Sequence, residues 1–156
     1  MTDVTNQADL PHQGRIVDGV HRYACRVYYE DTDLTGVVYH ANYLRFMERA
    51  RSDMLRCVGI EQQGLLTAGE GFYSVYDLAL TYRAPARLDD ILVVRTRVSQ
   101  VRAAATVLAQ DVWRGEQQLT SGTVTAAWLD MNGRPKRQPK SWAERFTELQ
   151  MQAEGQ

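Results

Sequence analysis

One amphipathic segment constrains the fold of this chain more than any other feature. Between residues 41 and 58, apolar side chains recur at steps of three and four, which is the spacing of one helix face. These residues are Tyr43, Phe46, Met47, Ala50, Met54, Cys57 and Val58. Leu44 and Leu55 widen the apolar surface on a second side, and Gly59 follows as a helix stop. We therefore expect one long helix that is covered for most of its length, and a sheet can cover it.

The sequence around this helix predicts strands. Residues 21–30 alternate with period two, so that Tyr23, Cys25, Val27 and Tyr29 fall on one face. After Gly71, four further stretches are rich in β-branched and aromatic residues: 72–83, 91–101, 104–113 and 118–129. The connections between them are too short for crossover helices, so we expect antiparallel pairing. One strand, one long helix and four strands define an α+β fold.

The two ends of the chain carry weaker signals. Residues 1–20 are polar and are predicted to form a flexible N-terminal arm, followed by a single domain over residues 21–150. A short helix is expected over residues 61–68. Ser141 is predicted to cap a last helix, with Glu144 completing a capping box.

Composition excludes several classes of protein. The chain has 156 residues, 44% of them apolar, and a formal net charge of −1, which gives no basic surface for nucleic acid. Its two cysteines, Cys25 and Cys57, are too few for a disulfide scaffold and are expected to be free. We find neither a secretory signal nor an apolar run of membrane-spanning length, so the expected location is cytoplasmic, with at most peripheral membrane contact.

The residues that carry chemistry lie between Tyr28 and Arg51. Residues 31–35 read DTDLT, which matches the DxDxT pattern of haloacid-dehalogenase-type hydrolases, but no alternating strand–helix units follow. The same loop fits the first positions of a calcium-binding EF-hand. Its twelfth position, however, is Asn42 where that loop needs a bidentate glutamate.

Acyl transfer is the interpretation that this stretch favours. A helix beginning near Ala41 directs free N–H groups and a partial positive charge back at the loop, where they can hold an oxyanion. Asp33 and His40 lie on either side of this junction. The carboxylate can attack a carbonyl or activate water, and the imidazole can assist. A thioester suits so small a site because a thiolate leaves easily.

The ordered motif DTDxxGVVYHANY, followed by FxERAR, resembles the hotdog-fold thioesterases of the 4-hydroxybenzoyl-CoA thioesterase type. Within this family the chain is most similar to the acyl-CoA thioesterases encoded with the Tol–Pal envelope machinery. The resemblance implies a curved antiparallel sheet wrapped around the long helix, and a homodimer or homotetramer with sites between subunits. It also implies that Asp33 is the catalytic carboxylate and that His40 assists, with its peptide N–H polarising the thioester carbonyl.

The remaining candidates are assigned supporting roles. Tyr39, Asn42 and Tyr43 are expected to line the substrate site, and Arg83 and Arg87 to hold the phosphates of coenzyme A. Asp31 is expected to brace the loop, and Gly36 to take a positive φ. Glu48 is expected to pair with Arg51 or Arg45. No metal and no other cofactor is expected.

Two rival functions stay open. One is a hotdog dehydratase that acts on 3-hydroxyacyl thioesters, although the DTD loop is not its usual arrangement. The other is a non-catalytic scaffold that binds acyl carrier protein or lipid-synthesis enzymes near the envelope. Acyl carrier protein is also a possible carrier of the thioester substrate.

Overall fold

The structure is a computed structural model that describes residues 7–155. Its strands are β1 Arg15–Val17, β2 Val20–Arg26, β3 Phe72–Tyr82, β4 Ile91–Val101, β5 Ala105–Arg114 and β6 Gln117–Leu129. Its α-helices are α1 Tyr43–Cys57, α2 Gln62–Thr67 and α3 Lys140–Glu154, and its 3-10 helices are η1 Gln7–Asp9, η2 Tyr29–Asp31 and η3 His40–Asn42. The strands form one antiparallel sheet in the order β1-β2-β4-β5-β6-β3, which leaves β3 at an edge.

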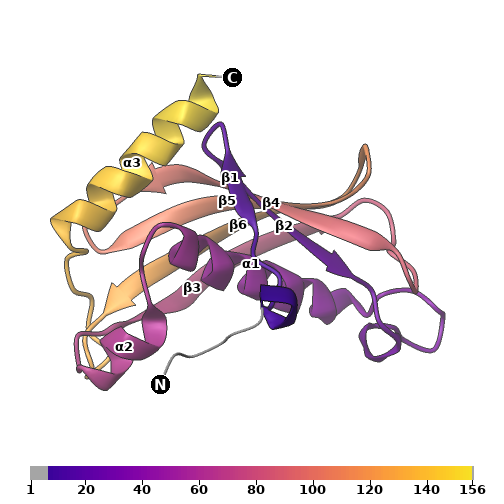
Figure 1. The fold of residues 1–156 in the computed structure, drawn as a ribbon, viewed down its shortest axis with the longest axis horizontal. Helices are drawn as coiled ribbons and strands as arrows, with labels where there is room; N and C mark the ends of the chain where they lie inside the picture. The colour runs from indigo at the N-terminus through magenta and orange to yellow at the C-terminus, as the bar shows by residue number, and fades with distance from the viewer. Residues whose placement is uncertain (1–6, 156) are drawn as a thin grey trace.

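Helix α1 lies along one face of this sheet, as Figure 1 shows. Phe46, Met47 and Ala50 are fully buried on the helix face that the apolar periodicity predicts. They belong to one core cluster with residues that the strands direct toward α1: Leu92, Val94, Val112, Leu119 and Val124. The predicted hotdog fold, a sheet around a long central helix, is confirmed.

A second core cluster continues this packing beyond the C-terminal end of α1. Phe146 and Leu149 of α3 share it with Val98 of β4 and Met54 of α1. Figure 1 shows α3 crossing one end of the sheet. The sheet therefore covers α1, and α3 packs on the part of the core that lies next to the C-terminal half of α1.

Several element boundaries differ from the sequence prediction. Strands β1 and the start of β2 lie within the predicted arm of residues 1–20, because a turn with positive φ at Asp18 and Gly19 joins them as a hairpin. Strand β2 ends at Arg26, and Tyr29 is exposed in η2 rather than on the buried face. Ser141 does not cap α3, since the helix begins at Lys140 with Pro139 as its N-cap residue and no side-chain capping bond.

The cysteines are free thiols, as predicted, and both are half-buried. Burial raises the pKa of Cys25 to about 11, so this thiol stays protonated at neutral pH. In the part of the chain that the structure describes, no helix has the length and apolar character needed to cross a membrane.

Candidate active site

The loop between η2 and η3 is held as a tight hairpin. Thr32 and Val38 form an antiparallel bridge, and the Asp33 N–H donates to the Val37 carbonyl at 2.9 Å. At its tip the Gly36 N–H donates to the Asp33 carbonyl, and Gly36 has a φ of +82°. This backbone conformation strains residues with a Cβ, so the predicted role of Gly36 is confirmed. The hairpin places Asp33 opposite Val37, and His40 follows the closing pair of Asp31 and Tyr39. The cavity that contains His40 is not lined by Asp33.

The Asp33 carboxylate is exposed and has two donors from one residue. Its Oδ1 accepts hydrogen bonds from the Thr35 hydroxyl at 2.6 Å and from the Thr35 N–H at 2.8 Å. These bonds, the hydroxyl first, lower the pKa of Asp33 below its ordinary value, and the nearby His40 adds to the effect. Asp33 therefore carries its negative charge at neutral pH, as a general base or a nucleophile must.

His40 begins the helical stretch that continues into α1. The first N–H groups of a helix have no acceptor within it, and the earliest bonded one here is Asn42, which donates to the Tyr39 carbonyl. The His40 ring is exposed and lies 4.5 Å from the Tyr39 ring, centroid to centroid. The Tyr82 hydroxyl donates to the His40 carbonyl at 2.5 Å, which ties this terminus to the end of β3.

A buried hydrogen-bond network beneath the loop fixes its position. The Asp31 carboxylate accepts from the Tyr28 N–H at 2.8 Å and from the Asn42 amide at 2.7 Å. Both Asp31 and Asn42 are buried, and their hydrogen bond joins η2 to the residue that precedes α1. Asp31 braces the loop as predicted, and the Asn42 side chain is directed at this brace. A contact between Asn42 and substrate stays a prediction.

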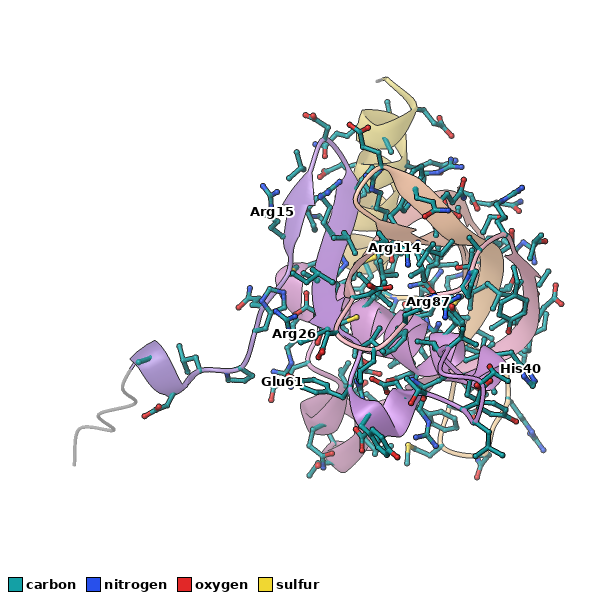
Figure 2. The ribbon with its side chains drawn as sticks, turned by 90° about the vertical axis from the view of Figure 1, so that its right-hand side faces the viewer. Arg15, Arg26, His40, Glu61, Arg87 and Arg114 are labelled. Atoms are coloured by element: carbon teal, nitrogen blue, oxygen red, sulfur yellow. The ribbon has the colours of Figure 1, made fainter. Side chains whose placement is uncertain are left out.

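An open cavity of about 330 Å³ lies beside His40 and brings together three of the predicted residues: His40, Tyr43 and Arg83. Tyr82 completes its aromatic wall; the sequence analysis places it within the predicted strand over residues 72–83 and gives it no role in the site. Arg87 is not among its lining residues, although its backbone bridges to Val37 of the loop. Figure 2 shows Arg87 and His40 on the same side of the molecule.

Tyr43 is a buried anchor of this cavity. Its hydroxyl accepts a hydrogen bond from the Ala86 N–H at 3.0 Å, and its side chain is only 2% exposed. We expect Tyr43→Phe to lower the free energy of unfolding by about 1–3 kcal/mol, because the buried Ala86 N–H then has no acceptor. Denaturant unfolding measures this, with Tyr39→Phe as the control, since the Tyr39 side chain is exposed. Equal stability of both variants would contradict the anchoring role.

A second cavity, of about 180 Å³, lies further along α1 and contains Glu48 and Arg51 among largely apolar neighbours. The predicted ion pair of Glu48 with Arg51 or Arg45 does not form, because Glu48 accepts from the Ser52 hydroxyl instead. Arg51 turns inward and donates to the Gln110 side chain at 3.0 Å. Burial lowers the pKa of this guanidinium. Sequence spacing places Glu48 and Arg51 one helical turn apart. It does not show that the Arg51 side chain is directed toward the sheet, where it binds Gln110 of β5.

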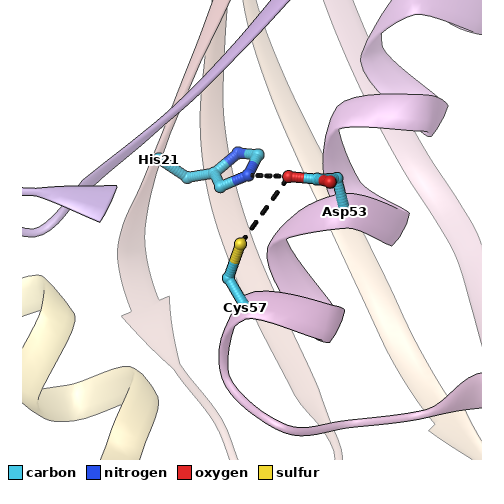
Figure 3. A group of neighbouring side chains, drawn as sticks. All are labelled: His21, Asp53 and Cys57. Atoms are coloured by element: carbon cyan, nitrogen blue, oxygen red, sulfur yellow. Dashed lines mark hydrogen bonds and ion pairs between the residues drawn. The ribbon is translucent and has the colours of Figure 1, made fainter. Parts of the chain in front are cut away.

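Among the described residues, one cluster has side chains that commonly bind metals: His21, Asp53 and Cys57, whose ligand atoms lie within 4.8 Å of one another (Figure 3). His21 Nε2 lies 2.6 Å from Asp53 Oδ2, and the Gly14 N–H donates to the same oxygen at 2.9 Å. Two ligands of one tetrahedral zinc stand about 3.3 Å apart, since each bond is about 2.0–2.2 Å long. The 2.6 Å separation is a hydrogen-bond length, so this geometry fits a structural hydrogen-bond cluster rather than a metal centre.

Comparison with known protein families gives a match that is consistent with the fold described above. The sequence profile of the thioesterase superfamily matches residues 35–121, a range that includes His40 and begins two residues after Asp33. The chain belongs to this superfamily.

Two relatives and one solved structure are similar to most of this chain. The acyl-CoA thioesterase YbgC of Haemophilus influenzae is 43% identical over 116 residues, covering 74% of this chain and 85% of the relative. The acyl-CoA thioester hydrolase YbgC of Escherichia coli is 40% identical over 127 residues, covering 80% of this chain and 94% of the relative. The crystal structure of a probable thioesterase from Bartonella henselae has a TM-score of 0.74 at 37% identity, covering 77% of this chain and 99% of that one. The family predicted from the DTD motif is confirmed.

Proposed function

We propose that this protein hydrolyses acyl-CoA thioesters to a carboxylic acid and coenzyme A. The observation that carries the proposal is the Asp33–Val37 hairpin, which presents an exposed carboxylate on the segment that leads directly into the helical start at His40. Two relatives that share 40% or more of the aligned residues are named for the same reaction. The fold alone does not specify this chemistry, so the proposal rests on the site and on these relatives together.

The roles follow from charge and position. The thioester carbonyl oxygen is directed at the free N–H groups at His40, which hold the negative charge that develops on that oxygen. Asp33 either removes a proton from a water that attacks the carbonyl carbon, or attacks that carbon itself to give an anhydride that water then cleaves. In both routes the carbon–sulfur bond breaks and coenzyme A leaves as a thiolate. The His40 imidazole assists by orienting the water or relaying its proton.

Substrate contacts are assigned to residues around the open cavity. Tyr39 and Tyr43 flank His40, and we propose that they border the reacting group. Arg83 lies in the cavity wall, and we propose that it and Arg87 hold the coenzyme A phosphates. Guanidinium groups suit this role because they bind phosphate oxygens in pairs.

We also propose that the protein works in the cytoplasm as a homodimer or homotetramer. The edge position of β3 supports the assembly, because Val75 and Tyr76 on this strand are exposed apolar side chains. A partner subunit on this edge covers them. Acyl carrier protein stays a candidate carrier of the acyl group.

The test is release of free thiol from short-, medium- and long-chain and aromatic acyl-CoA esters. We expect turnover of at least one ester, with stoichiometric acid and thiol. A parallel assay with 3-hydroxyacyl-CoA follows formation of the unsaturated thioester, which is the product of a dehydratase. No thiol release from any ester, or dehydration without hydrolysis, would overturn the proposal. In the first case, binding to acyl carrier protein would support the scaffold function.

A further inference from the structure

Three arginines stand in register across neighbouring strands on the sheet face opposite to α1. Arg15 of β1 pairs with Arg22 of β2, and Arg22 pairs with Arg95 of β4. Directly opposed residues of antiparallel strands project on the same face with their Cβ atoms about 4.5–5.5 Å apart. Leu92 and Val94 of β4 pack in the core that contains α1, so Arg95, an odd-numbered neighbour, points the other way. We call Arg15, Arg22 and Arg95 the arginine row.

The charges of the arginine row have little compensation in the described chain. Within residues 7–155, none of the three guanidinium groups forms an ion pair or a side-chain hydrogen bond. The next residue in register with Arg95 is Asp111, but Arg97 and Arg83 also act on this single carboxylate. Three arginines, Arg95, Arg97 and Arg83, thus share one acidic side chain. Like charges placed directly opposite each other, as in the arginine row, destabilise a sheet.

Packing holds side chains of the arginine row in defined orientations. The Arg95 guanidinium stacks 4.2 Å above the centroid of the Trp113 ring, which fixes the plane of its donors. Arg22 and Arg95 are half-buried, and the Nε of Arg95 is buried without an acceptor. Burial and the charges of Arg95 and Arg15 lower the pKa of Arg22. Donors with fixed planes and unsatisfied charge form a preorganised site for an anion.

We propose that the arginine row binds a small polyphosphate anion, with the phosphates lying across β1, β2 and β4. Planar guanidinium groups bind phosphate oxygens in pairs, and a chain of phosphates presents several negative charges in line. Arg15, at the outer end of the row, lies on the opposite side of the molecule from His40 of the proposed thioesterase site, as Figure 2 shows. A nucleotide and inorganic polyphosphate both carry this chemistry, so the test includes each.

The test is thermal unfolding of the purified protein with tripolyphosphate, ATP and coenzyme A as separate probes. A ligand that binds the folded state raises Tm, and we expect an increase of about 5 °C at saturation with tripolyphosphate. Equal shifts with ATP and tripolyphosphate indicate that the phosphates alone are recognised. A larger shift with ATP indicates a nucleotide ligand.

Variants decide whether the shift comes from the arginine row. Arg22→Gln and Arg95→Gln are each expected to weaken binding by about 10-fold or more, because each removes a charged donor pair. Arg22→Gln leaves the Arg95–Trp113 stack intact, so it separates binding from local packing. Arg56→Gln is the matched control, since Arg56 is an exposed arginine in the last turn of α1. No Tm shift with tripolyphosphate or ATP, or the same shift with these two probes in wild type and both row variants, overturns the proposal; a coenzyme A shift that persists in the row variants reports the thioesterase site instead.

Discussion

Replacing Asp33 with asparagine is expected to reduce acyl-CoA hydrolysis by about 10²-fold or more, the range for loss of a general base. Asparagine keeps the size of the side chain and can still accept from Thr35, so the hairpin is expected to persist. It is neither a base nor a nucleophile at neutral pH. The measurement is thiol release by wild type and variant with the same ester. Equal turnover would exclude Asp33 from the reaction.

Thr35→Val provides a control that changes the pKa of the Asp33 carboxylate without removing the carboxylate. The Thr35 hydroxyl is the first cause of the lowered pKa of Asp33. Asp33 acts in its ionised form, so activity is present above its pKa and is lost as the pH falls through that value. Removing the hydroxyl raises the pKa, and the acidic limb of the pH–rate profile is expected to move to higher pH. An unchanged acidic limb would show that Asp33 does not set it.

The largest expected loss of stability comes from His21→Ala, which we expect to cost about 3 kcal/mol of unfolding free energy. His21 is fully buried, and its Nε2 lies 2.6 Å from Asp53 Oδ2. Removing the ring leaves the buried carboxylate with one donor fewer and opens a cavity beside α1. Chemical denaturation measures the change, and His12→Ala is the control because His12 is exposed. A loss no greater than that of the control would refute the assigned contact.

The same histidine gives stability a pH dependence with a defined sign. Burial lowers the pKa of His21, although the hydrogen bond and the charge of Asp53 act in the opposite direction. The buried Nδ1 has no partner among the described residues, which also favours the neutral ring with Nε2 as donor. In the unfolded chain the His21 imidazole has a pKa of about 6.5, so as the pH falls it is protonated in the unfolded state before it is protonated in the folded state. The contribution of His21 is therefore complete above about pH 6.5 and decreases below it. When the pH falls from about 7.5 to about 5.5, the unfolding free energy of wild type is expected to decrease more than that of His21→Ala. Denaturant unfolding at the two pH values measures the difference.

The predicted helix and strands depend on local periodicity, and these were the reliable parts of the sequence prediction. The helix expected over residues 41–58 corresponds to η3 and α1, and the strand over residues 91–101 has the predicted limits. Capping was less reliable: Ser141 and Glu144 satisfy a capping-box pattern, yet Pro139 precedes the helix in their place. The pattern describes which bonds are possible, and the backbone path at Pro139 decides where the helix begins.

The sequence by itself determined the fold class and the positions of Asp33, Gly36 and His40 within one motif, because periodicity and motif spacing are local properties of the chain. Only the tertiary structure decided which polar groups meet across the fold. His21 is 32 residues from Asp53, and the arginine row unites β1 and β2 with β4, which follows about seventy residues later. No local pattern specifies such contacts, since they depend on strand register and on how the sheet curves around α1. Local spacing therefore predicted the candidate active site, whereas the buried histidine and the anion site emerge from the packing of distant segments.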